Sequence, residues 1–409
     1  MLTVEEARER ILSHFQPLTS EEIPLTEALG RVLARDAIAG ENLPSFANSA
    51  MDGYAICASD SAGASESAPR VLRLAGEVPA GRVYAGVVRP GEAVRILTGA
   101  PLPDGADAVL QQELTRVQGG SVELLAEVAP GNNIRYPGED VRSGTLLVPA
   151  GAELGPAEIA LLAATGVHRV TVSRRPRVAI LATGDELAPL GTTPQPGQIH
   201  ESNSPYLAAA VTRAGAIPIP LGIARDQADE LRAKLDAARD ADLALTSGGV
   251  SVGDYDLVKQ ILAEQGNIAF WRVRMRPGKP VAFGLLGQTP LLGLPGNPVS
   301  AAVTFELFGR PAIRRMLGCA SVLRPIVEVV LEEGEIHRAD RQQYVRARLF
   351  SRGGTLMART TGAQESHIIS SLRGATALLV VDIGEGSVRA GERVPALLLN
   401  DALPWGDAV

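Results

Sequence analysis

The spacing of apolar and polar residues at the start of the chain predicts a capped surface helix. Thr3 and Glu6 have the spacing of a capping box, and apolar residues follow at helical intervals. Residues 25–39 continue this amphipathic pattern. Residues 144–172 read as a strand, a helix and a second strand, and we expect them to rejoin the N-terminal segment as one discontinuous domain.

Between these two parts the pattern changes to short apolar runs punctuated by glycine and proline. Such punctuation is typical of a small β-rich domain. The segment that precedes the runs, residues 44–55, is polar and has few helix or strand preferences, which predicts a functional loop. The expected strands are residues 71–78, 92–97, 108–113 and 121–128.

From residue 177 to residue 317 strands alternate with helices, which predicts a doubly wound, mostly parallel α/β sheet. Ligands of such sheets bind at the carboxyl ends of the strands. The expected strands are residues 178–182, 217–222, 241–247, 268–275 and 290–294, and the expected helices are residues 204–214 and 228–238.

Residues 327–399 return to β patterning, which suits a small all-β barrel or sandwich. The fold class is therefore a multidomain chain of α/β and β units. We expect a discontinuous linker domain (1–45 and 141–175), a β-rich insertion (46–140), an α/β domain (176–325) and a C-terminal β-barrel (326–409).

Composition narrows the function classes. A net charge of −7 with 4% aromatic residues argues against a basic, base-stacking nucleic-acid surface. Cys57 and Cys319 lie far apart and have no CxxC partner, which indicates free thiols in a reducing compartment. The five histidines show no ligand spacing, so any metal would take oxygen ligands. An acidic N-terminus and the absence of a long apolar stretch predict a cytoplasmic protein without a membrane span.

The loop after the strand at 241–247 is a candidate anion site. Ser247, Gly248 and Gly249 let backbone N–H groups approach a ligand, and Ser251 follows in the same loop. The helical pattern of residues 257–262 would place this loop at a helix N-terminus, where anions are favoured. A plain strand-to-helix turn that binds nothing is an equal alternative for this stretch taken alone.

Three carboxylates, Glu186, Asp226 and Asp256, follow successive strands and would meet at one edge of the sheet. Carboxylates beside phosphate-binding amides usually indicate Mg²⁺, which bridges phosphate oxygens. The alternative is that each acid is a solvated loop residue or a helix cap.

Two rigid turns complete the candidate site. Arg276 and Lys279 flank Pro277 and Gly278, and together they would hold an oxyanion. The alternative is a basic hairpin tip. Residues 295–298 place two prolines around Gly296 and Asn297, which suits a preorganised ligand wall or an ordinary turn capped by Asn297.

The chain lacks the GxGxxG, GxxxxGK[ST] and GxSxG motifs of dehydrogenases, P-loop NTPases and α/β-hydrolases. What remains is a non-redox, Mg²⁺-assisted site for a phosphorylated or nucleotide-bearing ligand.

The order of these motifs resembles the molybdopterin molybdenumtransferase (MoeA) family and the similar E domain of gephyrin. The resemblance covers essentially the whole chain, and the motifs together are far more specific than any one of them. They are residues 48–55, 97–101, 135 with 138–140, 183–186, 247–253, 277–280 and 294–301.

The resemblance implies an elongated homodimer whose active sites lie between the α/β domain of one subunit and other domains of its partner. It implies a Mg²⁺-dependent reaction in which adenylyl-molybdopterin and molybdate give molybdenum cofactor and AMP. Other proteins of molybdenum cofactor biosynthesis are expected partners, whereas nucleic acid and membranes are not.

The resemblance also implies roles for particular residues. The functional acids are Asp52, Glu186 and Asp256, with Asp226 and Asp256 as metal ligands. Molybdate would be held by Arg276, Lys279, Arg346 and Ser366. Substrate-binding residues would be Thr98, Asp226, Ser247, Gly248, Gly249, Ser251, Pro295, Gly296, Asn297 and Pro298.

Two positions depart from the family pattern. Ala47 stands where many members have aspartate, which makes Asp52 the sole carboxylate of that motif. Arg276 stands where lysine is frequent, and this keeps the charge but changes its geometry.

Two alternatives to the transferase are a non-catalytic scaffold and an enzyme that only adenylylates molybdopterin. The acids and cations of the site favour an enzyme over a scaffold. The N-terminal and barrel domains argue against the adenylylating enzyme, which would lack them.

Overall fold

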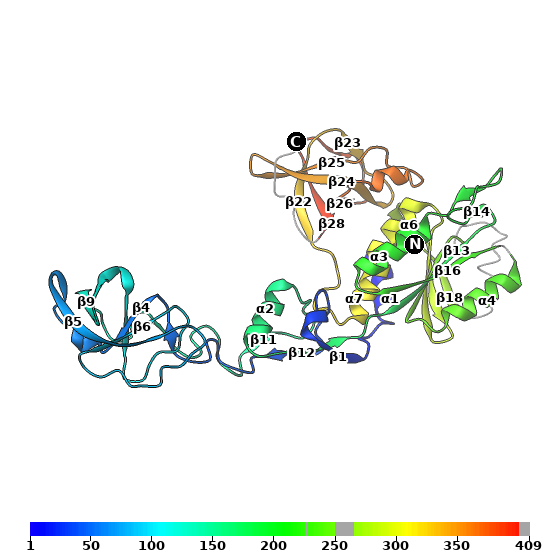
Figure 1. Cartoon of the computed structure of the whole chain (residues 1–409). Coiled ribbons are helices and arrows are strands. Elements are labelled where there is room, and N and C mark those ends of the chain that lie inside the picture. The colour runs from blue at the N-terminus through cyan, green and yellow to red at the C-terminus, as the bar shows by residue number, and fades with distance from the viewer. Residues whose placement is uncertain (226, 250–265, 401–409) are drawn as a thin grey trace.

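The computed structural model describes residues 1–225, 227–249 and 266–400. The chain is elongated, with a β-rich unit at one end and an α/β unit at the other (Figure 1). A small linker unit joins these two ends, and the C-terminal barrel lies against the α/β unit. The chain is thus divided into several small units, as expected for a chain of this length.

The linker unit is built from two distant parts of the chain. β1 (Ser20–Pro24) pairs antiparallel with β12 (Arg169–Ser173), and β2 (Ala37–Ile38) pairs with β11 (Leu146–Val148). α2 (Pro156–Ala164) packs beside them. The amphipathic pattern of residues 25–39 forms no long helix: it holds only the short 3₁₀ turn Leu25–Glu27 and strand β2.

The expected N-terminal helix is present as α1 (Val4–Leu12), with its capping box formed by Thr3 and Glu6. Its apolar face does not stay in the linker unit. Val4, Ala7 and Ile11 are buried in the main core of the α/β unit, so the first helix fastens the linker unit to that core.

The β-rich unit is a six-stranded sheet, called here the insertion sheet, with the order β7-β4-β6-β5-β9-β8. β4 lies between two neighbours and all four of its residues are buried. Part of the expected loop 44–55 is therefore a central strand, because its small and apolar residues suit a position between two partners. The strands are β4 (Gly53–Ile56), β5 (Ser65–Val78), β6 (Glu92–Ile96), β7 (Ala108–Gln111), β8 (Thr115–Gln118) and β9 (Ser121–Ala126).

Replacing Gly53 by alanine is expected to destabilise the insertion sheet by about 1–3 kcal/mol, because overpacked sites force backbone shifts. A Cβ at Gly53 would lie 2.1 Å from the carbonyl oxygen of Leu110 on the neighbouring strand. The loss is measured on the thermal transition of the insertion sheet, followed by circular dichroism. Gly120→Ala is the control, since a Cβ there meets no atom within 4 Å; equal stability of both variants would contradict the prediction.

The α/β unit contains a second six-stranded sheet, with the order β16-β13-β17-β21-β20-β18. The first four strands are parallel, and β20 and β18 are antiparallel additions. β20 was not expected from the sequence, and β18 ends before residue 275. The strands are β13 (Arg177–Thr183), β16 (Ile217–Ala224), β17 (Leu243–Ser247), β18 (Gly266–Arg272), β20 (Pro280–Leu286) and β21 (Thr289–Leu294).

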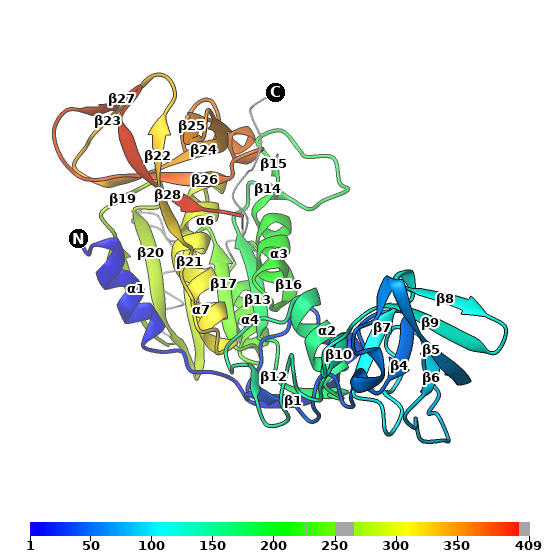
Figure 2. The same cartoon turned by 90° about the vertical axis from the view of Figure 1, so that its left-hand side faces the viewer.

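Helices cover both faces of this sheet, which Figure 1 shows nearly edge-on and Figure 2 shows from one face. Alternate residues of β13 point to opposite faces, so Val178 and Ile180 join one core and Ala179 and Leu181 the other. The first core also takes α3 (Asn203–Arg213), α6 (Pro298–Thr304) and α7 (Arg310–Met316), and the second takes α4 (Ala228–Ala238). The sheet is therefore doubly wound, as predicted.

The C-terminal unit is a closed barrel. Its strands pair in the ring β24-β25-β22-β28-β26, and β26 pairs again with β24. The barrel is tied to the α/β unit by β19 (Met275–Arg276), which pairs with the start of β24. The strands are β22 (Ile326–Leu331), β24 (Gln342–Arg352), β25 (Thr355–Thr360), β26 (Ala377–Val381) and β28 (Arg393–Leu398).

These units confirm the predicted fold class of an α/β domain joined to β-rich units and a barrel. Across the described part of the chain, helices are too short or too polar to cross a bilayer.

Candidate functional site

Two loops at the carboxyl ends of β17 and β21 lie side by side, and we call them the cradle: residues 247–249 and 295–298. Asn203, at the start of α3, joins them. Its side-chain amide nitrogen donates to Ser247 Oγ at 2.6 Å and to the carbonyl oxygen of Gly296 at 2.7 Å. The structure therefore brings together the described residues of both predicted substrate loops.

The glycines of the cradle have different uses. The N–H of Gly248 donates to the Leu294 carbonyl at 3.1 Å, so it is not a ligand donor. Gly248 has φ +95°, and a Cβ there would lie 2.7 Å from the Thr183 carbonyl oxygen. Glycine is thus required for the close approach of the ends of β17 and β13. Gly249 has φ +67°, and its N–H has no acceptor in the described ranges.

A cavity of about 390 Å³, called here the cationic cavity, lies between the α/β unit and the barrel. Arg276 is exposed and Lys279 is half-buried. Neither has an ion-pair partner among the residues that the structure describes. The lining residues are Arg276, Pro277, Gly278, Lys279, Pro280, Ser300, Arg341, Gln364, Glu365, Ser366 and His367.

The turn that carries these cations is tightly held. Gly278 has φ +101°, and a Cβ there would lie 2.6 Å from Thr304 Oγ1. On one side of the turn β19 pairs with β24, and on the other Lys279 accepts the N–H of Val273 at 2.8 Å through its carbonyl oxygen. The two positive side chains are thus presented by fixed backbone.

The cradle and the cationic cavity are connected through Asn297. Its side-chain nitrogen donates to Ser366 Oγ at 2.9 Å, and the N–H of Val299 donates to the Ser366 carbonyl at 3.1 Å. Ser366 belongs to the barrel and Asn297 to the α/β unit. Four of the predicted residues, Ser366, Asn297, Arg276 and Lys279, therefore surround one junction between two units.

Arg346 lies behind this junction. Its side chain is 1% exposed and does not line the cationic cavity. Its guanidinium donates to Ser371 Oγ and to the carbonyl oxygens of Ala363 and Glu365. Burial lowers the pKa of Arg346 to about 10, which leaves it charged at neutral pH. This position supports a role in holding the barrel loop, and direct contact with molybdate stays a prediction.

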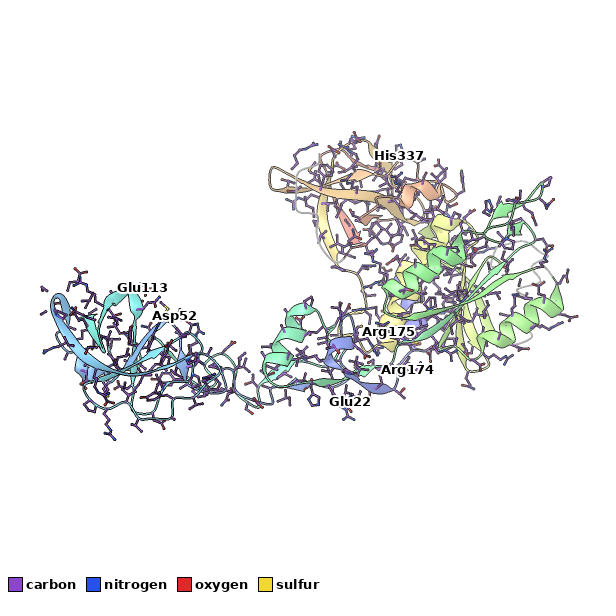
Figure 3. The ribbon with its side chains drawn as sticks, viewed as in Figure 1. Glu22, Asp52, Glu113, Arg174, Arg175 and His337 are labelled. Atoms are coloured by element: carbon purple, nitrogen blue, oxygen red, sulfur yellow. The ribbon has the colours of Figure 1, made fainter. Side chains whose placement is uncertain are left out.

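Asp52 and Thr98 form a separate pair on the insertion sheet. Asp52 Oδ1 accepts hydrogen bonds from the N–H and the hydroxyl of Thr98, both at 2.7 Å. The backbone bond and then the side-chain bond lower the pKa of Asp52. Figure 3 shows Asp52 at the end of the molecule away from the barrel and the α/β unit. Within one chain these two residues do not join the cradle.

Replacing Thr98 by valine is expected to raise the pKa of Asp52 while leaving it below 3.8, the ordinary value, because the backbone bond is kept. A lowered folded-state pKa gives stability that is present above that ordinary value and is lost as the pH falls through the folded pKa. Titration of the Asp52 carboxyl carbon by NMR measures the shift. Thr115→Val is the control, and an unchanged Asp52 midpoint in Thr98→Val would refute the prediction.

Of the three acids predicted at the strand ends, the structure describes one. Glu186 is exposed, and its carboxylate folds back over Gly184 so closely that a Cβ there would overlap it. Asp226, Ser251 and Asp256 lie outside the described residues. Over the described residues, no three His, Cys, Asp or Glu side chains gather as a metal site. The Mg²⁺ site stays a prediction.

The sequence pattern did not single out Asn203, which lies one residue before the expected helix at residues 204–214. A polar residue at a helix start is a usual cap, and nothing local indicates that its side chain reaches two distant loops. The cavity residues Arg341, Gln364 and His367 were also missed, because they come from barrel loops without a motif.

An apolar cavity of about 540 Å³ lies between the carboxyl end of β16 and the first turns of α3. Its size and lining are typical of a small-molecule site. Leu187, Pro220 and Ile223 supply apolar walls, and Glu201 and Ser204 supply polar atoms.

Three family profiles match this chain in order. They are the MoeA N-terminal region (domain I and II) over residues 2–166, a probable molybdopterin binding domain over 179–315, and the MoeA C-terminal region (domain IV) over 328–399. The chain belongs to the MoeA family. The resemblance inferred from the sequence motifs is therefore confirmed.

Curated and solved relatives agree with this placement in the MoeA family. The chain is 40% identical over 401 residues to Molybdopterin molybdenumtransferase 2 of Mycobacterium tuberculosis, covering 96% of this chain and 98% of that one. It is 40% identical to the Nostoc molybdopterin molybdenumtransferase, covering 93% and 89%. The crystal structure of the MoeA protein from Pyrococcus horikoshii OT3 superposes with a TM-score of 0.82 at 31% identity, covering 97% and 100%. An enzyme of the molybdenumtransferase type is therefore confirmed.

Proposed function

We propose that this chain inserts molybdenum during molybdenum cofactor biosynthesis, converting adenylyl-molybdopterin and molybdate into molybdenum cofactor and AMP. The observation that carries the proposal is the junction at Asn297 and Ser366, which joins the cradle directly to the cationic cavity. A phosphate group in the cradle and a dianion in the cavity would then lie side by side.

The charges of the cavity suit molybdate. Arg276 and Lys279 bring two positive charges without a carboxylate partner in the described structure, so both are available to an oxyanion. Ser366 adds a hydroxyl beside them. Fixed donors that need no rearrangement stabilise developing charge more strongly than mobile ones. Arg346 keeps the barrel loop in place for this task.

The cradle and the apolar cavity suit the other substrate. The Ser247 hydroxyl and the Gly249 N–H would be the donors to phosphate oxygens, and Gly248 lets the end of β17 approach Thr183 at the end of β13. The apolar cavity beside α3 supports a substrate that carries a ring system next to its phosphates.

Mg²⁺ is part of the proposal through the chemistry of its donors. Asp226 and Asp256 are carboxylates, the oxygen ligands that Mg²⁺ takes in proteins. When bound, Mg²⁺ supplies positive charge to the phosphate oxygens of the substrate.

A homodimer is proposed because one chain leaves the site incomplete. Asp52 and Thr98 are functional residues of the family pattern, yet the insertion sheet holds them far from the cradle (Figures 1 and 3). A partner subunit placed antiparallel and related by a twofold axis would bring its Asp52 to the cradle of the first. Such an arrangement gives two equal sites related by twofold symmetry.

The test is release of AMP from adenylyl-molybdopterin by the purified chain with molybdate and Mg²⁺, together with reconstitution of a molybdenum enzyme by the product. Release that depends on molybdate and on Mg²⁺ supports the proposal. A chain that binds molybdopterin but releases no AMP would instead favour the scaffold alternative.

A further inference from the structure

The cradle contains a hydrogen-bond arrangement whose direction can be determined from chemistry alone. The Gly296 carbonyl oxygen carries no hydrogen, so the Asn203 atom bonded to it at 2.7 Å must be the amide nitrogen. The same nitrogen contacts Ser247 Oγ at 2.6 Å. Ser247 is therefore an acceptor in this bond, and both hydrogens of the Asn203 amide are used.

The hydroxyl proton of Ser247 remains. A serine hydroxyl has one proton to donate, and in the described part of the chain no acceptor for it is found. Ser247 is 3% exposed. A buried donor without a partner is unfavourable, so the proton is available to whatever enters the cradle.

We infer that Asn203 is a positioning residue that turns the Ser247 hydroxyl into a donor aimed at an anionic ligand oxygen. Because Ser247 accepts from Asn203, its one proton is not used in that bond and can be donated to an anionic oxygen, which can only accept. The same amide holds Gly296 beside Gly248, whose Cα would lie 3.8 Å from a Cβ built on Gly296. The ligand oxygen in question is a phosphate oxygen, and this assignment rests on the proposed function.

Asn203→Asp is the sharpest test because the side chain keeps its shape. A carboxylate cannot donate to the Gly296 carbonyl, and it would accept the Ser247 proton itself. We expect AMP to bind the variant about 10- to 100-fold more weakly by isothermal titration calorimetry, the range for a hydrogen bond to a charged group. In steady-state turnover, KM for adenylyl-molybdopterin should rise more than kcat falls.

Three further variants separate positioning from other effects. Asn203→Ala removes the donors without adding a charge, and it should weaken AMP binding in the same direction even if Asn203→Asp fails to fold. In the Ser247→Ala background, Asn203→Ala should change AMP affinity by less than about threefold, because coupled residues are not additive. Ser202→Ala is the control, since Ser202 precedes α3 and makes no capping bond.

An equal loss of affinity from Asn203→Ala with and without Ser247 would overturn the inference, as would wild-type affinity in Asn203→Ala. If the wild type binds neither AMP nor inorganic pyrophosphate, the cradle takes no phosphate and the inference fails. If the wild type binds AMP but does not release it from adenylyl-molybdopterin, the proposed reaction fails, and Asn203 is still judged by the affinities.

Discussion

Replacing Lys279 by alanine is expected to lower molybdate-dependent AMP release by about 100-fold, the usual effect of removing one fixed donor to a developing anion. Lys279 lines the cationic cavity and has no ion-pair partner among the described residues. Its charge is therefore available to the proposed molybdate ligand. The measurement is initial rate against molybdate concentration, and KM for molybdate should rise as well.

Two variants serve as controls for this result. Lys279→Arg keeps the charge, so it should lose much less activity than Lys279→Ala. Arg352→Ala removes an exposed barrel cation that pairs with Glu332 and does not line the cavity, and it should retain wild-type rates. A Lys279→Ala enzyme with unchanged molybdate dependence would show that the cavity does not bind molybdate.

A mixed dimer of Asp52→Ala and Lys279→Ala subunits is expected to recover about half of the wild-type rate, although each parent is nearly inactive. In a twofold dimer whose sites combine Asp52 of one subunit with Lys279 of the other, one of the two sites is then fully intact. Co-expression with two different tags isolates the mixed dimer, and AMP release measures its activity.

The outcome distinguishes two architectures. If each site were built from a single chain, both sites of the mixed dimer would carry a defect, and its rate would equal that of the parents. A monomer in sedimentation analysis would also contradict the prediction. The control is a mixed dimer of wild-type and Arg352→Ala subunits, which should show full activity.

Much of the α/β unit and the barrel could be predicted from the sequence. Helix α4 occupies residues 228–238 as expected, and β26 (residues 377–381) lies within the expected β pattern of residues 327–399. The spacing of apolar residues is helical in α4, which buries one face. In β26 it is a short continuous apolar run, because this strand lies between two others. The amphipathic pattern of residues 25–39 did not give a helix, because its apolar side chains belong to a turn and a short strand and do not form one helix face.

The candidate site was less accessible to sequence reasoning. Residues 247–249 and 295–298 each follow a strand of the expected parallel sheet. This position correctly placed the two loops at the same edge, because the carboxyl ends of parallel strands lie together. Nothing local could show that Asn203 joins the two loops, or that the Gly248 N–H is already used. Burial of Arg346 was equally hidden, since a charged residue in a strand reads as exposed until its carbonyl partners are known.

The insertion sheet also affects how the chain unfolds. Its buried clusters include only residues 47–134, whereas the barrel residues Tyr344, Leu378 and Leu397 share a core with the α/β sheet. The chain enters and leaves the insertion at adjacent points, where Leu43 bridges Val141. We therefore expect the insertion to unfold as a separate cooperative unit, so that a single melting temperature would not describe the whole chain. Mutations there can accumulate without lowering the stability of the cradle.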